Sequence, residues 1–189
     1  MEKVMVVSSA KSVDSSIKGL LKEAGYSNII TVQNGAMARR TMVEHDVDIV
    51  IINCPLSDEF GMELAEEIVV GTNSSVMLLV KSELAEEVSY EAEKLGVFVL
   101  SKPLSKVIFY QSLRMLHIAY QRISGLKKEN DRLKNRIADI RLVEQAKYAL
   151  IHYCNMSENE AHHYIEKNAM DQRISKREVA KNIISKYNL

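Results

Sequence analysis

The sequence predicts an α/β domain with a five-stranded parallel sheet, followed by one long helix and a small all-α module. Three patterns in the 189 residues predict this fold class. Up to about residue 105, short apolar runs alternate five times with amphipathic helical segments, which is the rhythm of strands and crossover helices. From residue 107 to about residue 153 the pattern is helical, and no proline interrupts it. Beyond that point, two separate helix-start signals predict two short helices.

The expected strands are continuous apolar runs rather than alternating ones, as in the VDIVII segment that ends at Ile52. Such runs suit parallel strands whose two faces are both covered by helices, because neither face then meets water. The first 105 residues are enough for a layered core of this kind. The sequence therefore predicts strands at residues 3–7, 28–32, 47–52, 76–80 and 97–100.

Helical patterns fill the intervals between these strands. In the first interval, Gly25 follows the pattern as a plausible helix terminator. The apolar positions of that helix recur at helical spacing and are Val13, Ile17, Leu20, Leu21 and Ala24. The expected helices of this domain are residues 13–24, 35–44, 62–70 and 84–95.

The formal net charge of zero hides a strong asymmetry along the chain. Residues 1–105 carry 9 basic and 16 acidic side chains, whereas residues 106–189 carry 16 basic and 9 acidic ones. A basic C-terminal module favours a polyanionic partner, and nucleic acid is the commonest. The alternative is a basic helical hairpin that binds nothing.

Targeting and redox features are also informative. No apolar run approaches the length of a membrane span, and the N-terminus becomes polar too quickly for a signal peptide. Cys54 and Cys154 show no disulfide-framework spacing. We therefore expect a reduced, cytoplasmic protein without a membrane association.

Residues 1–120 resemble the receiver domain of response regulators, which has a flavodoxin-like fold. The resemblance rests on the β/α rhythm, on Gly61 eight residues beyond Asn53, and on the Ser101-Lys102-Pro103 segment after the fifth strand. In that family, an Asp at the end of strand three accepts a phosphoryl group and an acidic pair after strand one holds Mg²⁺. A Ser or Thr ends strand four, an aromatic residue lies in strand five, and a Lys closes the site.

This chain departs from the receiver pattern at nearly every site position. The corresponding residues are Asn53 for the acceptor, Ser8 and Ser9 for the acidic pair, Val80 for the hydroxyl, Val99 for the aromatic and Lys102 for the lysine. A carboxamide is a poor nucleophile, and neutral serines supply no anionic oxygen for Mg²⁺. We expect a pseudo-receiver without ordinary phosphorylation, controlled by a regulatory protein partner, by a ligand or by nothing. The alternative is a scaffold that only dimerises.

Two other carboxylates lie close to the predicted site. Asp58 and Glu59 follow Asn53 by five and six residues. They are expected to be solvated loop charges rather than substitute acceptors.

Residues 107–140 show a heptad pattern that predicts a parallel two-stranded coiled coil and hence a homodimer. Phe109 and Ala119 also occupy core positions of the repeat, and Asn130 is the polar residue that would fix the register. The alternative is that this helix packs only on its own chain. The predicted dimerisation residues are Leu116, Ile123, Leu126, Asn130, Leu133, Ile137 and Ile140.

The remaining segment contains two capping boxes and several spaced motifs. Ser157 to Glu160 and Ser175 to Glu178 both fit the S-x-x-E pattern. The motifs are Arg141-x-x-Glu144-Gln145-Ala146-Lys147, Met156-Ser157-Glu158-x-Glu160-Ala161, Ala169-Met170-Asp171-x-Arg173-Ile174-Ser175 and Glu178-Val179-Ala180. In order and spacing, residues 136–189 resemble the ANTAR domain of transcription antitermination regulators. Tyr148 departs from the family, which commonly has Gly there.

The ANTAR resemblance implies RNA binding. Members of that family bind leader transcripts with two small stem-loops, the second overlapping a terminator, and a dimer presents one module to each loop. The predicted RNA-binding residues are Arg141, Lys147, His163, Tyr164, Lys167, Arg173, Lys176, Arg177 and Lys181. Among them, Lys147, Arg173 and Lys176 are expected to contribute most. The alternative for Arg141 and Arg173 is an intramolecular ion pair with Glu144 or Asp171.

Other chemistries find little support in the sequence. The spacing of Cys154 with His152, His162 and His163 matches no usual zinc pattern, and no catalytic motif or cofactor signature is present. The sequence therefore predicts a dimeric RNA-binding antiterminator that is not an enzyme. The alternatives are a DNA-binding regulator that uses the last two helices, and an interaction-only pseudo-receiver.

Overall fold

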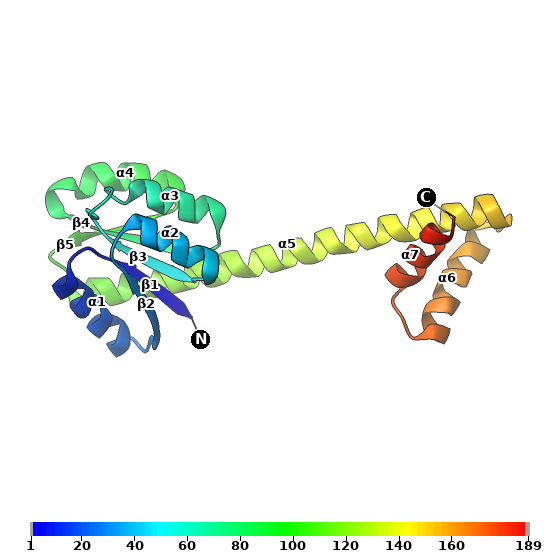
Figure 1. Cartoon of the computed structure of the whole chain (residues 1–189), viewed down its shortest axis with the longest axis horizontal. Helices are drawn as coiled ribbons and strands as arrows, with labels where there is room; N and C mark the ends of the chain where they lie inside the picture. Colours follow the sequence, from blue (N-terminus) through cyan, green and yellow to red (C-terminus); the bar gives the residue numbers. More distant parts are fainter. Residues whose placement is uncertain (1, 188–189) are drawn as a thin grey trace. The chain divides into compact units, whose positions relative to one another are not determined.

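The computed structural model describes residues 2–187, apart from the side chains of residues 11–14. The apolar position predicted at Val13 therefore lies outside the described residues. The chain divides into two compact units, one up to Gly125 and one from Leu126 onward. The helix α5 (Lys106–Cys154) runs through the boundary as a single helix (Figure 1).

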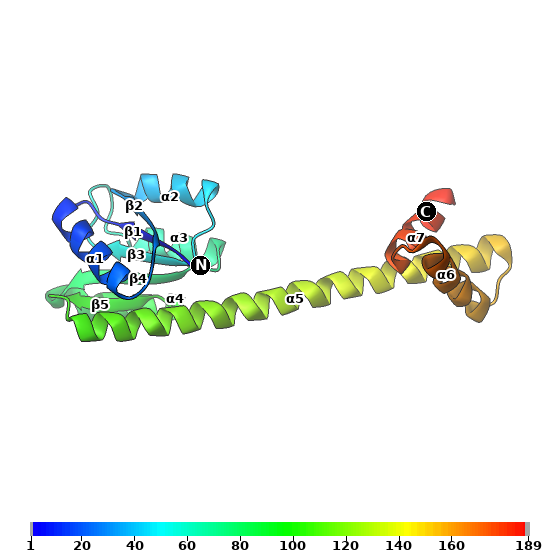
Figure 2. The same cartoon turned by 90° about the horizontal axis from the view of Figure 1, so that it is seen from below.

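The first unit is built on a parallel five-stranded sheet, which confirms the predicted fold class (Figure 2). The strand order is β2-β1-β3-β4-β5, and every neighbouring pair is parallel. Predicted and observed bounds agree for β1 and β2, and the other strands differ by one or two residues at their ends. The strands are β1 (Lys3–Val7), β2 (Asn28–Val32), β3 (Ile49–Asn53), β4 (Ser75–Lys81) and β5 (Phe98–Lys102).

Helices cover both faces of this sheet, as the continuous apolar strands require. Side chains of α1 and of the first part of α5 pack on one face, and side chains of α2, α3 and α4 pack on the other. A 3₁₀ turn at Ser82–Leu84 precedes α4. The helices between the strands are α1 (Lys11–Glu23), α2 (Gly35–Glu44), α3 (Met62–Gly71) and α4 (Ala85–Leu95).

The start of α5 belongs to the core of the first unit. Phe109 and Leu116 are fully buried there beside Leu113. This corrects the predicted dimerisation role of Leu116, because a side chain that fills the core of its own chain is not available to a partner. The exposed apolar positions of the heptad pattern begin at Ile123.

The second unit is a three-helix assembly of the end of α5 with α6 (Glu158–Gln172) and α7 (Lys176–Lys186). Both predicted capping boxes are confirmed. The Ser157 hydroxyl accepts from the Glu160 N–H at 3.3 Å, and the Glu160 carboxylate accepts from the Ser157 N–H at 2.8 Å. Ser175 and Glu178 begin α7 in the same way. The buried core is made of Ala146, Ala149, Leu150, Ala161, Ile165, Val179, Ala180 and Ile183.

Among the described residues, no helix is long and apolar enough to cross a membrane.

Candidate functional site

The carboxyl ends of β1 and β3 lie side by side in the centre of the sheet. The helix that follows β1 packs on one face, whereas the helix that follows β3 packs on the other. Such a switch point leaves a crevice at the sheet edge, where open α/β sheets bind their ligands. Ser8 follows β1 and Asn53 ends β3, so the fold brings these two predicted site residues to that crevice.

A closed set of hydrogen bonds joins three of the predicted site residues. The Asn53 amide donates to the Ser8 hydroxyl at 3.1 Å, and the Lys102 ammonium donates to the Asn53 amide oxygen at 2.9 Å. Lys102 also donates to the carbonyl of Cys54 at 2.7 Å. Ser8 and Asn53 are buried. Both ends of the Asn53 amide therefore have partners within the protein.

The other three predicted positions do not join this set. The Ser9 hydroxyl is exposed and donates to the carbonyl of Gln33 at 3.1 Å. Val80 is fully buried in the core, and Val99 packs against that same core. Lys81, which sequence reasoning missed, is exposed and in register with Lys102. The sequence feature that could have identified Lys81 is its position directly after the apolar VMLLV run.

The crevice carries positive charge and no carboxylate among its predicted residues. Burial lowers the pKa of Lys102, and the Lys81 ammonium lowers it as well, against the opposite influence of Cys54. Burial raises the pKa of the Cys54 thiol to about 12, so this sulfur stays protonated and unreactive at neutral pH. Within the described residues, no three His, Cys, Asp or Glu side chains gather into a potential metal site.

Asp58 is an exposed loop charge, as expected, but its carboxylate has partners within the protein, and Glu59 is only partly exposed. The Asp58 carboxylate accepts from the backbone N–H groups of Gly35 and Ala36, both at 3.0 Å, at the start of α2. These hydrogen bonds lower the pKa of Asp58. Carboxylates are favourable at this end of a helix because its first N–H groups lack partners. The loop after β3 is thus fastened to α2.

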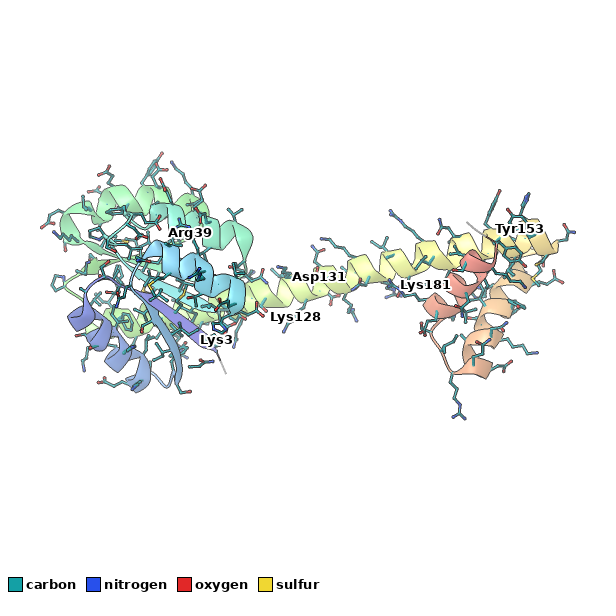
Figure 3. The ribbon with its side chains drawn as sticks, in the orientation of Figure 1. Lys3, Arg39, Lys128, Asp131, Tyr153 and Lys181 are labelled. Carbon is teal, nitrogen blue, oxygen red and sulfur yellow. The ribbon has the colours of Figure 1, made fainter. Side chains whose placement is uncertain are left out.

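Arg39, which is labelled in Figure 3, connects the same loop to α2 a second time. Its guanidinium pairs with Glu59, and with Glu67 of α3 at 2.6 Å. A side chain at Gly35 would collide with the Glu59 carboxylate, so this arrangement requires glycine there. Sequence reasoning missed these contacts because the partners are about 20 to 28 residues apart.

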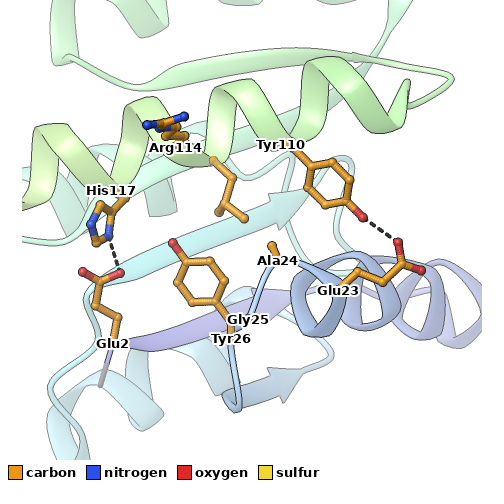
Figure 4. A pocket seen from close by; sticks show the side chains of 9 residues that line it. Glu2, Glu23, Ala24, Gly25, Tyr26, Tyr110, Arg114 and His117 are labelled. Atoms are coloured by element: carbon orange, nitrogen blue, oxygen red, sulfur yellow. Dashed lines mark hydrogen bonds and ion pairs between the residues drawn. The ribbon is translucent and has the colours of Figure 1, made fainter.

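A separate cavity of about 490 Å³ lies between the end of α1 and α5 (Figure 4). The His117 ring contacts the Glu2 carboxylate at 2.6 Å at one side of it, and the Tyr110 hydroxyl donates to Glu23 at 2.7 Å at the other. The Tyr26 ring lies between these two pairs. Burial and the Glu2 carboxylate raise the pKa of Tyr26. The cavity is within the size range of small-molecule sites.

Three of the predicted RNA-binding cations form ion pairs instead of facing solvent unpaired. Lys147 on α5 contacts Glu158 of α6 at 3.1 Å and Glu144 at 2.9 Å. The same unit contains two further ion pairs between helices, Lys176 of α7 with Glu166 of α6 at 2.6 Å and Arg177 of α7 with Asp139 of α5 at 2.7 Å. Each pair of helices is therefore joined by one ion pair. This corrects the leading role expected for Lys147, whose side chain is only 10% exposed.

Four predicted cations are exposed and have no carboxylate partner among residues 2–187. They are Arg141, Lys167, Arg173 and Lys181. Arg173 follows α6 in the left-handed conformation, with φ of +54°. The intramolecular pairs considered for Arg141 and Arg173 are not formed, and Glu144 contacts Lys147 instead. Of the two predicted RNA-binding residues with aromatic rings, His163 is mostly exposed and Tyr164 is 42% exposed.

A chain of aromatic contacts at the end of α5 was not predicted. The rings of Tyr153 and Tyr187 are stacked, with centroids 4.9 Å apart, and Tyr153 projects from α5 (Figure 3). Tyr148 and His152 are stacked as well, with centroids 5.9 Å apart. The contact between Tyr148 and His152 could have been predicted from their i, i+4 spacing on one helix face. The contact with Tyr187 depends on how α7 folds back, which the sequence pattern did not specify.

Comparison with protein families gives two matches along the chain. The family model of the response regulator receiver domain matches residues 4–114, and that of the ANTAR domain matches residues 131–184. The transcriptional regulatory protein PdtaR of Mycobacterium tuberculosis is 23% identical over 182 residues. That alignment covers 96% of this chain and 89% of PdtaR.

Solved structures show the same fold for the first unit. The signal receiver domain of an HD domain-containing protein from Pseudomonas fluorescens aligns with a TM-score of 0.58 at 19% identity, covering 67% of this chain and 92% of that one. A response regulator receiver domain protein from Clostridium thermocellum aligns with a TM-score of 0.54 at 23% identity. That alignment covers 68% of this chain and 98% of the other.

Replacing Asp58 with alanine removes the carboxylate that fastens the loop to α2, so we expect the first unit to unfold at a lower temperature at neutral pH. The pKa of folded Asp58 lies below its ordinary value of 3.8. Asp58 therefore stabilises the folded state fully at a pH above its ordinary pKa, and this stabilisation is lost as the pH falls through the lowered pKa of the folded protein. Thermal unfolding followed by circular dichroism should show the difference between wild type and Asp58→Ala shrinking in acid.

The matched control is Glu66→Ala, because Glu66 is an exposed carboxylate on α3 without an ion pair in the described part of the chain. This variant should unfold like the wild type at neutral pH. Equal unfolding temperatures for Asp58→Ala and Glu66→Ala would contradict the fastening role.

Proposed function

Because the chain belongs to the response regulator receiver family and carries an ANTAR domain after its receiver domain, we propose that it is an RNA-binding transcription antiterminator. The C-terminal unit would hold stem-loops of a leader transcript, so that the overlapping terminator does not form. The observation that carries this proposal is the set of four cations, Arg141, Lys167, Arg173 and Lys181, that no carboxylate neutralises within residues 2–187. An antiterminator works where transcripts are made, which places the chain in the cytoplasm.

Electrostatics supports two different roles for the basic residues, RNA binding for the unpaired ones and helix packing for the paired ones. Unpaired cations can replace the counterions of phosphate groups, which supplies much of the affinity for nucleic acid. Lys147, Lys176 and Arg177 are already paired across the three helix interfaces, and their role in this proposal is to hold the helices in place. Exposed ion pairs contribute little free energy individually, but they favour one relative orientation of the helices.

An exposed apolar stripe on α5 supports the homodimer. Its members are 47% to 66% exposed and are Ile123, Leu126, Leu133, Ile137 and Ile140. Asn130 occupies one position of the same heptad series and is exposed. A parallel coiled coil would bury these side chains, and paired asparagines would set its register. The proposed organisation is a pseudo-receiver at residues 1–120, a dimerisation segment within 107–140 and an RNA-binding domain at 136–189.

The geometry of the crevice supports a receiver that is not phosphorylated in the usual way. Asn53 stands at the end of β3 with its amide bound to Ser8 and Lys102. An amide forms no acyl phosphate, and neither Ser8 nor Ser9 supplies a charge for Mg²⁺. RNA binding in this proposal therefore needs no phosphodonor. A regulatory protein, or a ligand of the cavity beside α1 and α5, would supply any control.

RNA binding is tested with the full chain, a labelled leader RNA with two hairpins, and no phosphodonor. We expect Arg141→Ala/Lys181→Ala to bind more weakly than wild type, and to lower the slope of log affinity against log salt by about 2, because each phosphate contact contributes about 1. Fluorescence anisotropy over a salt series gives both quantities.

The matched control for this experiment is Lys22→Ala/Arg40→Ala, which removes two exposed cations from the receiver domain. It should keep wild-type affinity and slope. Duplex DNA of equal length, tested at the same salt, should compete poorly. Equal competition by DNA would favour the DNA-binding alternative, and no RNA binding by the wild type would refute the proposal.

Phosphorylation is tested by incubating the full chain with acetyl phosphate and Mg²⁺, followed by intact-mass spectrometry. We expect no mass increase and no change in RNA affinity, because Asn53 offers no carboxylate to accept the phosphoryl group. A receiver domain that has an acceptor aspartate, incubated in the same tube, shows that the donor is active. A gain of one phosphoryl group by this chain would contradict the proposal.

Dimerisation is tested by placing a charge within the exposed stripe. Leu133→Glu should convert the dimer into a monomer, because it would bury two carboxylates in the seam. Asn135→Glu inserts the same charge at the outer position of the heptad and should leave the dimer intact. Sedimentation velocity distinguishes the two states, and a dimer that survives Leu133→Glu would place the interface elsewhere.

A further inference from the structure

A small groove between α6 and α7 has three carboxamide side chains in its lining. Its volume is about 150 Å³, well below the ~300–1,000 Å³ of most small-molecule pockets, so it has room for one flat group. Val179 and Ile183 form the apolar part of the lining. The polar part is Tyr164, Asn168, Gln172, Asn182 and Lys186.

Three carboxamides thus meet in one groove, although they come from two helices. Asn168 donates to the carbonyl of Tyr164 at 2.8 Å, and Gln172 donates to the Asn168 amide oxygen at 3.2 Å. These bonds hold two of the amides in fixed orientations. Asn182 lines the groove, is exposed, and has no hydrogen-bond partner for its amide among the described residues. Adjacent donors and acceptors match the edge of a nucleobase.

Aromatic and cationic groups border the same groove. Tyr164 supplies a ring in its wall, and the Lys186 ammonium lies 5.6 Å from the ring of Tyr187, which is itself stacked on Tyr153. Lys167 and Lys181 are the sequence neighbours of Asn168 and Asn182, and both are exposed without an ion pair in residues 2–187. Rings that stack on unpaired bases, next to cations that contact phosphate, are typical of single-stranded RNA recognition.

We propose that the groove between α6 and α7 binds one unpaired base of the hairpin loop. The amides of Asn182 and Gln172 contact the edge of that base, the Tyr164 ring packs beside it, and Lys186 contacts the adjoining phosphate. This inference rests on the proposed RNA-binding function and adds the part of the site that selects the loop sequence. The exposed cations described above would bind any RNA backbone, whereas this groove would distinguish one loop from another.

The test combines one protein variant with a series of loop changes, using the full chain at one stated salt concentration. Asn182→Ala breaks no hydrogen bond among the described residues, so the helices should keep their packing. We expect it to weaken binding about tenfold, because a good amide–base contact contributes ~1–3 kcal/mol. Abasic nucleotides are then placed at each loop position in turn, and affinity is measured for both proteins.

At one loop position, the abasic change should weaken RNA binding by the wild type by about as much as Asn182→Ala does. The same abasic change should not weaken RNA binding by the Asn182→Ala variant any further. Such non-additivity identifies the base that contacts Asn182, because both changes remove the same interaction. Asn159→Ala, which removes an exposed amide from the start of α6, should bind like wild type. Circular dichroism confirms that each variant is folded.

The other outcomes separate the two proposals. If the wild type binds hairpins but Asn182→Ala binds them equally well, or if its loss adds to the abasic loss at every position, the groove is not a base site and RNA binding stands. If the wild type binds no hairpin RNA, both the proposed function and this inference fall.

Discussion

One helix, α5, supplies side chains to two separate hydrophobic cores, with Leu116 near its start and Leu150 near its end. Each core covers one face of the helix at its own end. Between these ends, the apolar positions from Ile123 to Ile140 are exposed. Contiguous exposed apolar surface of this kind is normally an interaction site. The dimer proposal therefore follows from how α5 is anchored, as well as from the heptad pattern.

In the crevice of the receiver domain, the polar side chains are hydrogen-bonded to one another. Buried polar groups are costly when unpaired, and the buried Asn53 amide avoids that cost through Ser8 and Lys102. Lys102 thus has the uncharged Asn53 amide as a hydrogen-bond partner. In the same domain, Asp58 and Arg39 fasten the following loop to α2. Together these contacts hold Asn53 and the loop that follows it in place.

Local signals predicted most of the fold, and long-range contacts account for what they missed. Apolar runs located all five strands, and the two S-x-x-E motifs located the starts of α6 and α7. Leu116 was assigned to the dimer seam because a heptad repeat and a core-facing helix have nearly the same period. The pairing of Lys147 with Glu158, and the contact of Asp58 with α2, depend on segments that meet only in the folded chain.

The candidate RNA surface was predicted by residue type but not by arrangement. Basic residues could be counted from the sequence, yet three of them are neutralised by carboxylates of neighbouring helices. The amides around Asn182 were not recognised because they come from two helices. The parallel sheet has a further consequence, for the kinetics of folding. Lys3 at the start of β1 bonds to Asp48, 45 residues away, whereas the helical unit is held by contacts closer in sequence. Since distant contacts close slowly, the C-terminal unit should reach its native structure before the first unit, even though the ribosome synthesises it later.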